Sequence, residues 1–144
     1  MRFVKQNFVA LLKKLTLHND VAEVPLLAEW VEQLGDDLGL GMPEVFQLNL
    51  ALEEAVVNVM NYAYQDSGLI NLSASTEDSE IVFVLEDSGK AFDPTKADAP
   101  DITLSAEDRD IGGLGIFLVQ QLMSSVTYCR KDGKNVLTMI YKRQ

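Results

Sequence analysis

Residues 44–65 read Glu44-Val-Phe-Gln-Leu-Asn-Leu-Ala-Leu-Glu-Glu-Ala-Val-Val-Asn-Val-Met-Asn-Tyr-Ala-Tyr-Gln65, and this stretch decides the fold. Pro43 lies just before it and Gly68 just after it, as is typical of helix boundaries, so the stretch predicts one long helix. Its apolar residues recur at helical spacing and predict a stripe that faces a core. The members of this stripe are Leu48, Leu52, Ala55, Val59 and Ala63.

The same helix carries a polar stripe. At about 100° per residue, Gln47, Glu54, Asn58, Asn61 and Gln65 fall within a sector of roughly 60°. Glu54 and Asn58 are one turn apart, so their side-chain oxygens can converge on one point. A carboxylate beside a carboxamide can accept a proton next to a ligand for a hard cation. A solvated helix face is the alternative interpretation of this stripe.

Length and composition predict one compact domain over residues 1–144, because 47% of the 144 residues are hydrophobic and can form a sizeable core. No apolar run approaches the roughly 18 residues of a membrane span, so no membrane association is expected. The longest apolar run in residues 1–14 is shorter than the core of a secretory signal, about 7–15 residues, so we expect a cytoplasmic protein. The single Cys129 excludes an intrachain disulfide.

The formal net charge of −10 is unevenly distributed along the chain. Between Lys14 and Lys90 the sequence has 15 acidic residues and neither lysine nor arginine. Such a region would repel a phosphate backbone, so the sequence excludes nucleic acid as a partner of this region.

The order of predicted elements indicates the fold class. Helices separated by hairpins predict an α+β two-layer sandwich, with helices on one face of a mixed, mainly antiparallel sheet. Residues 1–12 are left as an N-terminal extension, and residues 95–110 have little periodicity. The predicted strands cover 13–18, 69–76, 80–86, 126–130 and 135–142, and the other predicted helices cover 21–38 and 111–123.

Three polar clusters together predict a nucleotide site. They are Glu54, Asn58 and Asn61 on the long helix, Asp87 and Gly89 after a buried strand, and Gly112, Gly113 and Gly115 at a helix start. Asp87 at a strand end can accept a hydrogen bond from the exocyclic amine of adenine, and Gly89 would let the base approach the backbone. Each cluster also has a structural explanation, as a turn, a solvated face or close packing.

The charge of the surroundings decides how phosphates would be bound. Residues 86–110 contain eight acidic and three basic residues, so side chains alone would repel a triphosphate. The free N–H groups of a glycine-rich helix start, the helix dipole and a divalent cation can supply the attraction. Mg²⁺ commonly takes one or two protein oxygens together with phosphates and water, and Asn58 is suited to supply one.

The three clusters also resemble the motifs of a known family. Glu54-Ala-Val-Val-Asn58 resembles the N-box of the Bergerat-fold (GHKL) ATPases, and Asp87-Ser-Gly-Lys-Ala-Phe-Asp-Pro94 resembles their first glycine box. Gly112-Gly-Leu-Gly-Ile-Phe-Leu-Val119 resembles their second. The details are most similar to the anti-sigma-factor serine kinase branch, over roughly residues 13–142. The resemblance implies a Bergerat-type ATP-binding fold, with residues 95–111 as the ATP lid.

The resemblance also implies roles for single residues. Glu54 resembles the general base, Asn58 the Mg²⁺ ligand, Asp87 the adenine-reading acid and Gly89 its partner. Thr138 matches a strand threonine that supports the adenine contact. Further nucleotide-binding positions implied by the boxes are Ala91, Phe92, Gly112, Gly113, Leu114 and Gly115. Asn61, which follows the N-box, and Arg109, which could reach a γ-phosphate from the lid, are expected to bind the nucleotide as well.

The implied activity is phosphorylation by ATP of a serine on a small antagonist protein, or alternatively sequestration of a sigma factor; a homodimer is also compatible with the family. Two positions depart from the family. Asn61 stands where many relatives have histidine, and Ile111 stands where relatives often have arginine, with Arg109 two residues earlier. A nucleotide-gated binding module with little catalysis therefore stays open as an alternative, as does a stand-alone ATPase or an accessory domain of a larger signalling system.

Overall fold

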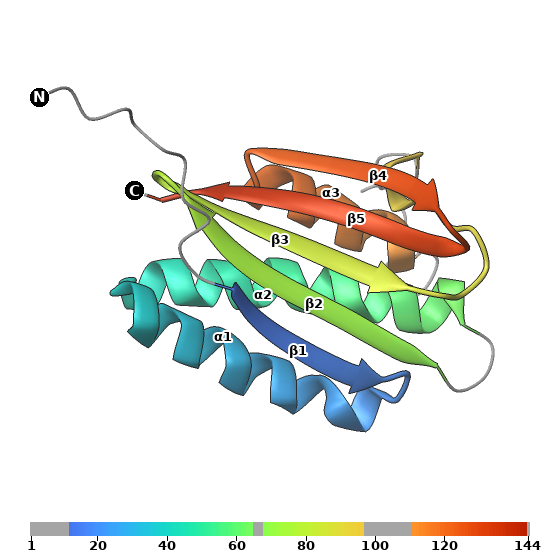
Figure 1. The fold of residues 1–144 in the computed structure, drawn as a ribbon, viewed down its shortest axis with the longest axis horizontal. Helices are drawn as coiled ribbons and strands as arrows, with labels where there is room; N and C mark the ends of the chain where they lie inside the picture. The colour runs from blue at the N-terminus through green and yellow to red at the C-terminus, as the bar shows by residue number, and fades with distance from the viewer. Residues whose placement is uncertain (1–11, 65–67, 97–110, 144) are drawn as a thin grey trace, which may run out of the picture.

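The computed structural model describes residues 12–64, 68–96 and 111–143, with the backbone alone for 111–115. One five-stranded sheet has the strand order β1-β2-β3-β5-β4, and all four neighbouring pairs are antiparallel. Three helices lie on one face of this sheet, behind the strands in Figure 1. The strands are β1 (Leu12–His18), β2 (Leu69–Glu77), β3 (Glu80–Asp87), β4 (Ser125–Lys131) and β5 (Lys134–Lys142).

The helices confirm the predicted two-layer α+β sandwich. The described strand pairs are antiparallel throughout, where a mixed sheet was expected. The long helices are α1 (Val24–Leu38), α2 (Met42–Asn58) and α3 (Ile111–Leu122). The short turns are η1 (Val21–Glu23), η2 (Val59–Ala63) and η3 (Pro94–Lys96).

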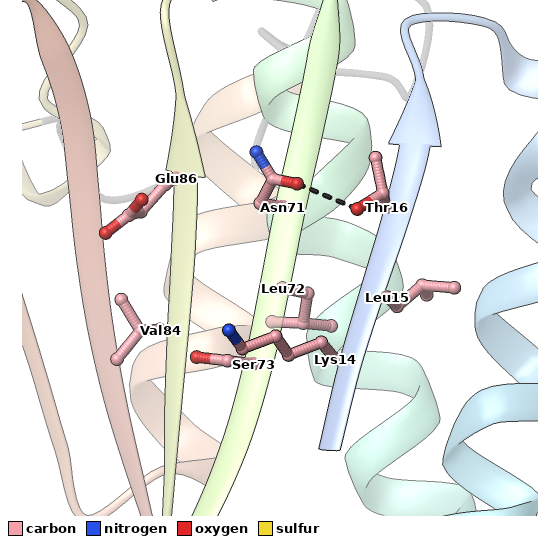
Figure 2. A pocket seen from close by; sticks show the side chains of 8 residues that line it. All are labelled: Lys14, Leu15, Thr16, Asn71, Leu72, Ser73, Val84 and Glu86. Atoms are coloured by element: carbon pink, nitrogen blue, oxygen red, sulfur yellow. Dashed lines mark hydrogen bonds between the residues drawn. The ribbon is translucent and has the colours of Figure 1, made fainter. Parts of the chain in front are cut away.

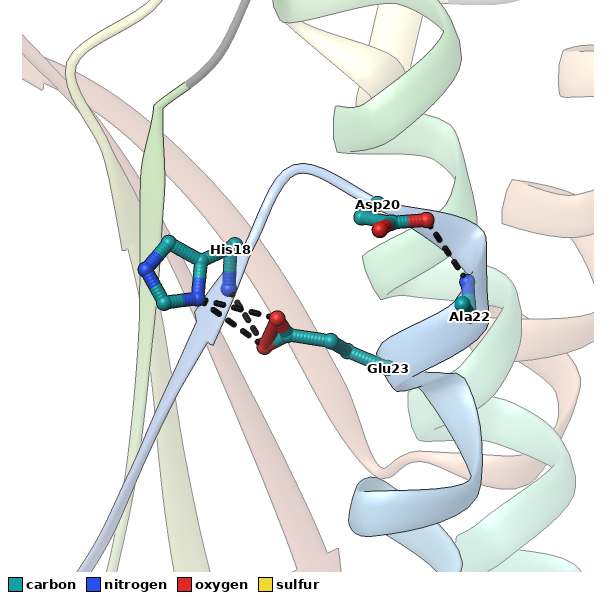
Figure 3. Close-up of polar contacts among 4 residues, drawn as sticks. All are labelled: His18, Asp20, Ala22 and Glu23. Carbon is teal, nitrogen blue, oxygen red and sulfur yellow. Dashed lines mark hydrogen bonds and ion pairs between the residues drawn. The ribbon is translucent and has the colours of Figure 1, made fainter.

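The connection from β1 to α1 is held by local polar contacts (Figure 3). The carboxylate of Asp20 accepts a hydrogen bond from the Ala22 amide over 2.9 Å and so caps the turn η1. Glu23 accepts the backbone N–H of His18 over 2.8 Å and also pairs with the imidazole Nδ1 of His18. The lone histidine is therefore part of a structural contact.

The helix α2 confirms the predicted core stripe, but its end differs from the prediction. Leu48, Leu52, Ala55, Val59 and Ala63 are all buried. The α-helix ends at Asn58, and the next five residues form the π-helical turn η2. Such turns occur mostly as single-turn bulges in α-helices and are frequent at functional sites.

The face of the sheet opposite the helices is polar near β1 and β2. It has a hollow of about 280 Å³, lined in part by Lys14, Thr16, Asn71 and Glu86. Figure 2 shows these side chains, with Thr16 donating a 2.8 Å hydrogen bond to Asn71. None of the predicted nucleotide-binding residues lines this hollow, so the candidate site lies elsewhere.

Candidate functional site

Asp87 is the last residue of β3 and is buried with 3% of its surface exposed. Burial alternates along β3, so Asp87 shares the helix-covered face with Leu85 and Phe83. Its Oδ1 accepts two hydrogen bonds, from the Gly89 amide over 2.9 Å and from the Asn135 side-chain amide over 2.8 Å. Both described hydrogen bonds go to Oδ1, and no hydrogen bond from a described residue reaches the other carboxylate oxygen.

Asn135 is the centre of this polar cluster, although the sequence did not single it out. It is buried, and its Nδ2 donates to Asp87 and to the Lys90 carbonyl, each over 2.8 Å. Its Oδ1 accepts the Phe92 amide over 3.1 Å. The two ends of one amide thus hold both the carboxylate and the loop that follows it.

The edge strand β4 supports Asn135 from the other side. Tyr128 donates its hydroxyl to Asn135 Oδ1 over 2.5 Å, and the Arg130 Nη1 donates to the same oxygen over 3.1 Å. Arg130 Nη1 also donates to the Gly89 carbonyl over 2.8 Å. These contacts link the Asp87 loop to two strands at once, so β4 helps to fix the carboxylate.

Gly89 has a packing role that the sequence did not indicate. A Cβ atom built on it would lie 2.3 Å from the carbonyl oxygen of Ala63, which belongs to the backbone of η2. The next amide, from Lys90, donates to that same carbonyl over 2.9 Å. Only glycine leaves room for this contact, so the loop after β3 is attached directly to the π-helical turn.

Two tyrosines that follow the N-box complete this attachment. Tyr64 donates its hydroxyl to the Leu69 carbonyl over 2.9 Å and accepts the Ser88 amide over 2.7 Å. The ring of Tyr62 stacks on that of Phe92, with centroids 5.3 Å apart. The predicted residue Phe92 therefore packs against η2, whereas its neighbour Ala91 is exposed.

Glu54 and Asn58 occupy successive turns of α2, as predicted. Glu54 is half-buried, and its pKa is raised above the ordinary value of 4.5, chiefly by burial and further by the neighbouring charge of Glu53. Asn58 is buried, and its Nδ2 has no hydrogen-bond partner among the described residues. An orphaned buried amide costs free energy, so its retention indicates a contact that the described fold does not supply.

The remaining predicted residues are distributed as follows. Asn61 lies in η2 and is exposed. Gly112, Gly113, Leu114 and Gly115 form the first turn of α3, which begins at Ile111, so their amides belong to the helix start that phosphate binding requires. Arg109 and most of the predicted lid, residues 97–110, lie outside the described residues.

Thr138 does not join the cluster around Asp87. It alternates along β5 with Asn135, Leu137 and Met139, which are buried under the helices, so its side chain belongs to the opposite face of the sheet. Asn135, three residues earlier and paired in register with Asp87, holds the supporting position instead. The strand was predicted correctly, but the position that supports Asp87 was not.

The chemistry of the donor set limits how a metal could be held. Among the described residues, no three His, Cys, Asp or Glu side chains cluster closely enough to hold a metal ion. Asn58 alone fits a cation that takes most of its ligands from phosphates and water, as Mg²⁺ does. A cavity of about 10 Å³ lies next to Asp87 and is also lined by Phe92, Pro94 and Asn135. This cavity is too small for a nucleotide base, but Asp87 also lines a second hollow of about 390 Å³, together with Tyr64, Ser88 and Lys134.

In the part of the chain that the structure describes, no helix is both long and apolar enough to cross a membrane.

Comparison with known sequences shows a consistent set of relatives. Residues 17–141 match the family described as histidine kinase-like ATPase domain. The chain is 33% identical over 96 residues to the serine/threonine-protein kinase BtrW of Bordetella bronchiseptica, covering 65% of this chain and 68% of the relative. It is 32% identical over 114 residues to the serine-protein kinase RsbW of Staphylococcus epidermidis, covering 72% and 69%. The RsbW of Staphylococcus aureus is 28% identical over 136 residues, covering 84% and 86%.

Solved structures share the fold at low sequence identity. The RsbU and RsbW domains of Rv1364c from Mycobacterium tuberculosis superpose with a TM-score of 0.66 at 14% identity, covering 92% of this chain. The present chain spans 32% of that longer one. A histidine kinase domain from Erythrobacter litoralis gives a TM-score of 0.53 at 15% identity, covering 83% of this chain and 60% of the other.

Proposed function

Because the chain belongs to the family of histidine kinase-like ATPase domains, we propose that it is a regulatory protein serine kinase that uses ATP and Mg²⁺. The observation that carries this proposal is the one-turn pairing on α2 of a half-buried Glu54, whose pKa is raised, with a buried Asn58. The Nδ2 of Asn58 has no partner among the described residues and can donate to a phosphate oxygen, and its Oδ1 is the atom that would ligate Mg²⁺. The serine kinase names of the aligned relatives support the same reading.

In the proposed reaction, Glu54 accepts the proton of the incoming serine hydroxyl. The serine oxygen forms a bond to the γ-phosphorus of ATP, and the bond from that phosphorus to the β–γ bridging oxygen breaks, so ADP leaves. A raised pKa makes Glu54 a stronger base than an ordinary carboxylate. Mg²⁺, when bound, neutralises charge on the β- and γ-phosphates, and Asn58 would be its protein ligand.

Binding of the nucleotide would use the other two clusters. Asp87 would accept the adenine amine at its unoccupied carboxylate oxygen, while Asn135 and Gly89 hold Oδ1. The amides at the start of α3 would hold the phosphates. We further propose that residues 95–111 form a lid over the nucleotide.

The partners follow from the same family reading. We propose that the phosphorylated serine belongs to a small antagonist protein and that the kinase alternatively sequesters a sigma factor. We place this exchange in the cytoplasm, where ATP and a sigma factor are both present. A homodimer is part of this proposal and is tested by the molecular mass in solution.

The decisive experiment measures single-turnover phosphoryl transfer from γ-labelled ATP to antagonist proteins encoded beside this gene. Glu54→Gln should lower the rate by about 10²–10⁴-fold at saturating ATP, with little change in ATP affinity. Asn58→Ala should weaken both Mg·ATP binding and turnover. Glu29→Gln is the control, because Glu29 is an exposed acid on the neighbouring helix α1 and has no assigned role.

One other function fits a specific observation. Ile111 stands directly before the glycine turn where the family often has arginine, which favours a nucleotide-gated binding module with slow transfer. A Glu54→Gln rate within threefold of wild type would favour this module over the kinase. In that case Asn58→Ala would still weaken control of the partner.

A further inference from the structure

A groove between α1 and α2 exposes apolar side chains that the proposed nucleotide site does not use. It measures about 430 Å³ and is lined in part by Leu40, Met42, Val45 and Phe46. Met42 is 86% exposed and Phe46 is 68% exposed, the highest values among the large hydrophobic side chains of the described residues. A contiguous apolar patch of this kind commonly marks an interaction site.

The helix packing creates the groove. Gly35 on α1 lies so close to α2 that an added Cβ would meet the Val45 side chain at 2.5 Å. Such a close approach at the C-terminal end of α1 brings the two helix surfaces together. The short connection Gly39–Gly41 then places Met42 and Phe46 beside the α1 surface.

The rim of the groove is acidic. Glu32 and Asp36 line it from α1, both are exposed, and they are one helical turn apart. The sequence has neither lysine nor arginine between Lys14 and Lys90, which includes all of α1 and α2. An occupant with cationic groups would be complementary, whereas the same patch of a second copy would place acids against acids.

The walls of the groove favour a helical occupant. They come from two helices and the turn between them, so they offer no strand edge to pair with an extended peptide. A helix satisfies its own backbone hydrogen bonds and needs only an apolar stripe to fit. Asn49 also lines the groove, and its buried Oδ1 has no hydrogen-bond partner among the described residues, so one acceptor remains for a side-chain donor.

We propose that this groove binds an amphipathic helix of a protein partner that carries lysine or arginine residues one turn apart beside its apolar stripe. The site is separate from the proposed nucleotide site. Phe46 and Asn58 are 12 residues apart, or about 18 Å along α2, and Asn49 and Asn58 are half a turn apart around its axis. The groove lies on the side of α2 that faces α1, away from Asn58. A partner helix could therefore bind there whether or not the chain is a kinase.

The test uses two synthetic 14-residue helical peptides labelled with fluorescein. One has leucines at positions i, i+3, i+4 and i+7 with lysines elsewhere, and its twin has glutamate in place of every lysine. Fluorescence anisotropy without nucleotide should show saturable binding of the lysine peptide, one per chain, and none of the glutamate peptide. Phe46→Asp should weaken binding at least tenfold, while Leu26→Ser, an exposed leucine on the opposite flank of α1, should stay within twofold.

Two double variants that remove the same amount of negative charge distinguish the effect of the groove rim on peptide binding from the effect of the net charge of the protein. Glu32→Gln with Asp36→Asn should weaken the lysine peptide at least fivefold. Asp78→Asn with Asp132→Asn removes the same charge from two hairpin turns, where asparagine suits the positive φ, and should have less than a twofold effect.

Three outcomes would overturn the proposal. Equal weakening by both charge pairs would mean binding to bulk negative charge. Self-association that is lost in Phe46→Asp would assign the groove to a second copy. Tighter peptide binding after deletion of residues 2–11 would assign it to the basic N-terminal segment of the chain itself. None of these results depends on phosphoryl transfer, so they are distinct from a failure of the kinase proposal.

Discussion

Asn135 Nδ2 donates a 2.8 Å hydrogen bond to Asp87 Oδ1, and the two residues stand opposite each other on β5 and β3. This bond fixes one oxygen of a buried carboxylate, and no hydrogen bond from a described residue reaches the other. The donor is itself fixed by Tyr128 and Arg130 on the edge strand. The orientation of the proposed adenine reader is therefore set by three neighbouring strands.

Asp87→Asn should weaken ADP binding about 10- to 100-fold, because a charge-assisted hydrogen bond to the adenine amine is worth roughly 1.5–3 kcal/mol. Asparagine keeps an oxygen for the Gly89 amide, so the fold should persist. Calorimetric titration of ADP measures the effect. Glu86→Gln is the control, because Glu86 faces the other side of the sheet. A dissociation constant of Asp87→Asn within twofold of wild type would reject Asp87 as the residue that binds the adenine amine.

Asn135→Ala should destabilise the protein by about 2–4 kcal/mol, since it removes one hydrogen bond from the buried Asp87 carboxylate and one each from the part-buried backbone groups of Lys90 and Phe92. Urea denaturation followed by circular dichroism measures the loss. Thr138→Ala on the same strand, but on the other face, should cost less than about 1 kcal/mol. Equal losses of stability in the two variants would show that the hydrogen bonds of Asn135 contribute no more to stability than the side chain of Thr138.

Gly89→Ala should cost about 1–3 kcal/mol, because the added methyl group would overlap the Ala63 carbonyl and force the loop away from η2. The displaced loop should also weaken ADP binding. In Gly41→Ala the new methyl group would meet only Pro43, at 3.6 Å, so a loss below about 1 kcal/mol is expected. Thermal unfolding with and without ADP compares the two, and unchanged stability of Gly89→Ala would contradict the packing role.

Glu54 should make the folded state less stable as pH rises. Its folded pKa lies above its unfolded value, so its favourable contribution is present at acidic pH and is lost as the pH passes through the folded pKa. Glu54→Gln should therefore stabilise the protein at pH 7 relative to wild type, by less than about 1 kcal/mol because solvent screens this half-exposed group. This gain in stability should vanish near pH 4. Urea denaturation of both proteins at pH 7 and pH 4 measures it. A gain that is larger at pH 4 would contradict the raised pKa.

The sequence determined those features that depend on local periodicity and on turn residues. The buried stripe of α2 follows from a 3.6-residue repeat, and the pairing of Glu54 with Asn58 follows from their one-turn spacing. The Asp132-Gly133 turn, with positive φ at both residues, sets the register that places Arg130 opposite Asn135. The sequence therefore contained that pair, although it was not recognised.

Tertiary structure alone decided which strands are neighbours and which faces meet. Asp87 and Asn135 are 48 residues apart, and only the insertion of β5 between β3 and β4 brings them together. The same step excluded Thr138, because a strand side chain faces one side only and no local pattern shows which residue aligns with Asp87. The contact of Gly89 with Ala63 likewise depends on the π-helical turn. The helical repeat of the sequence does not predict the extra residue in this turn.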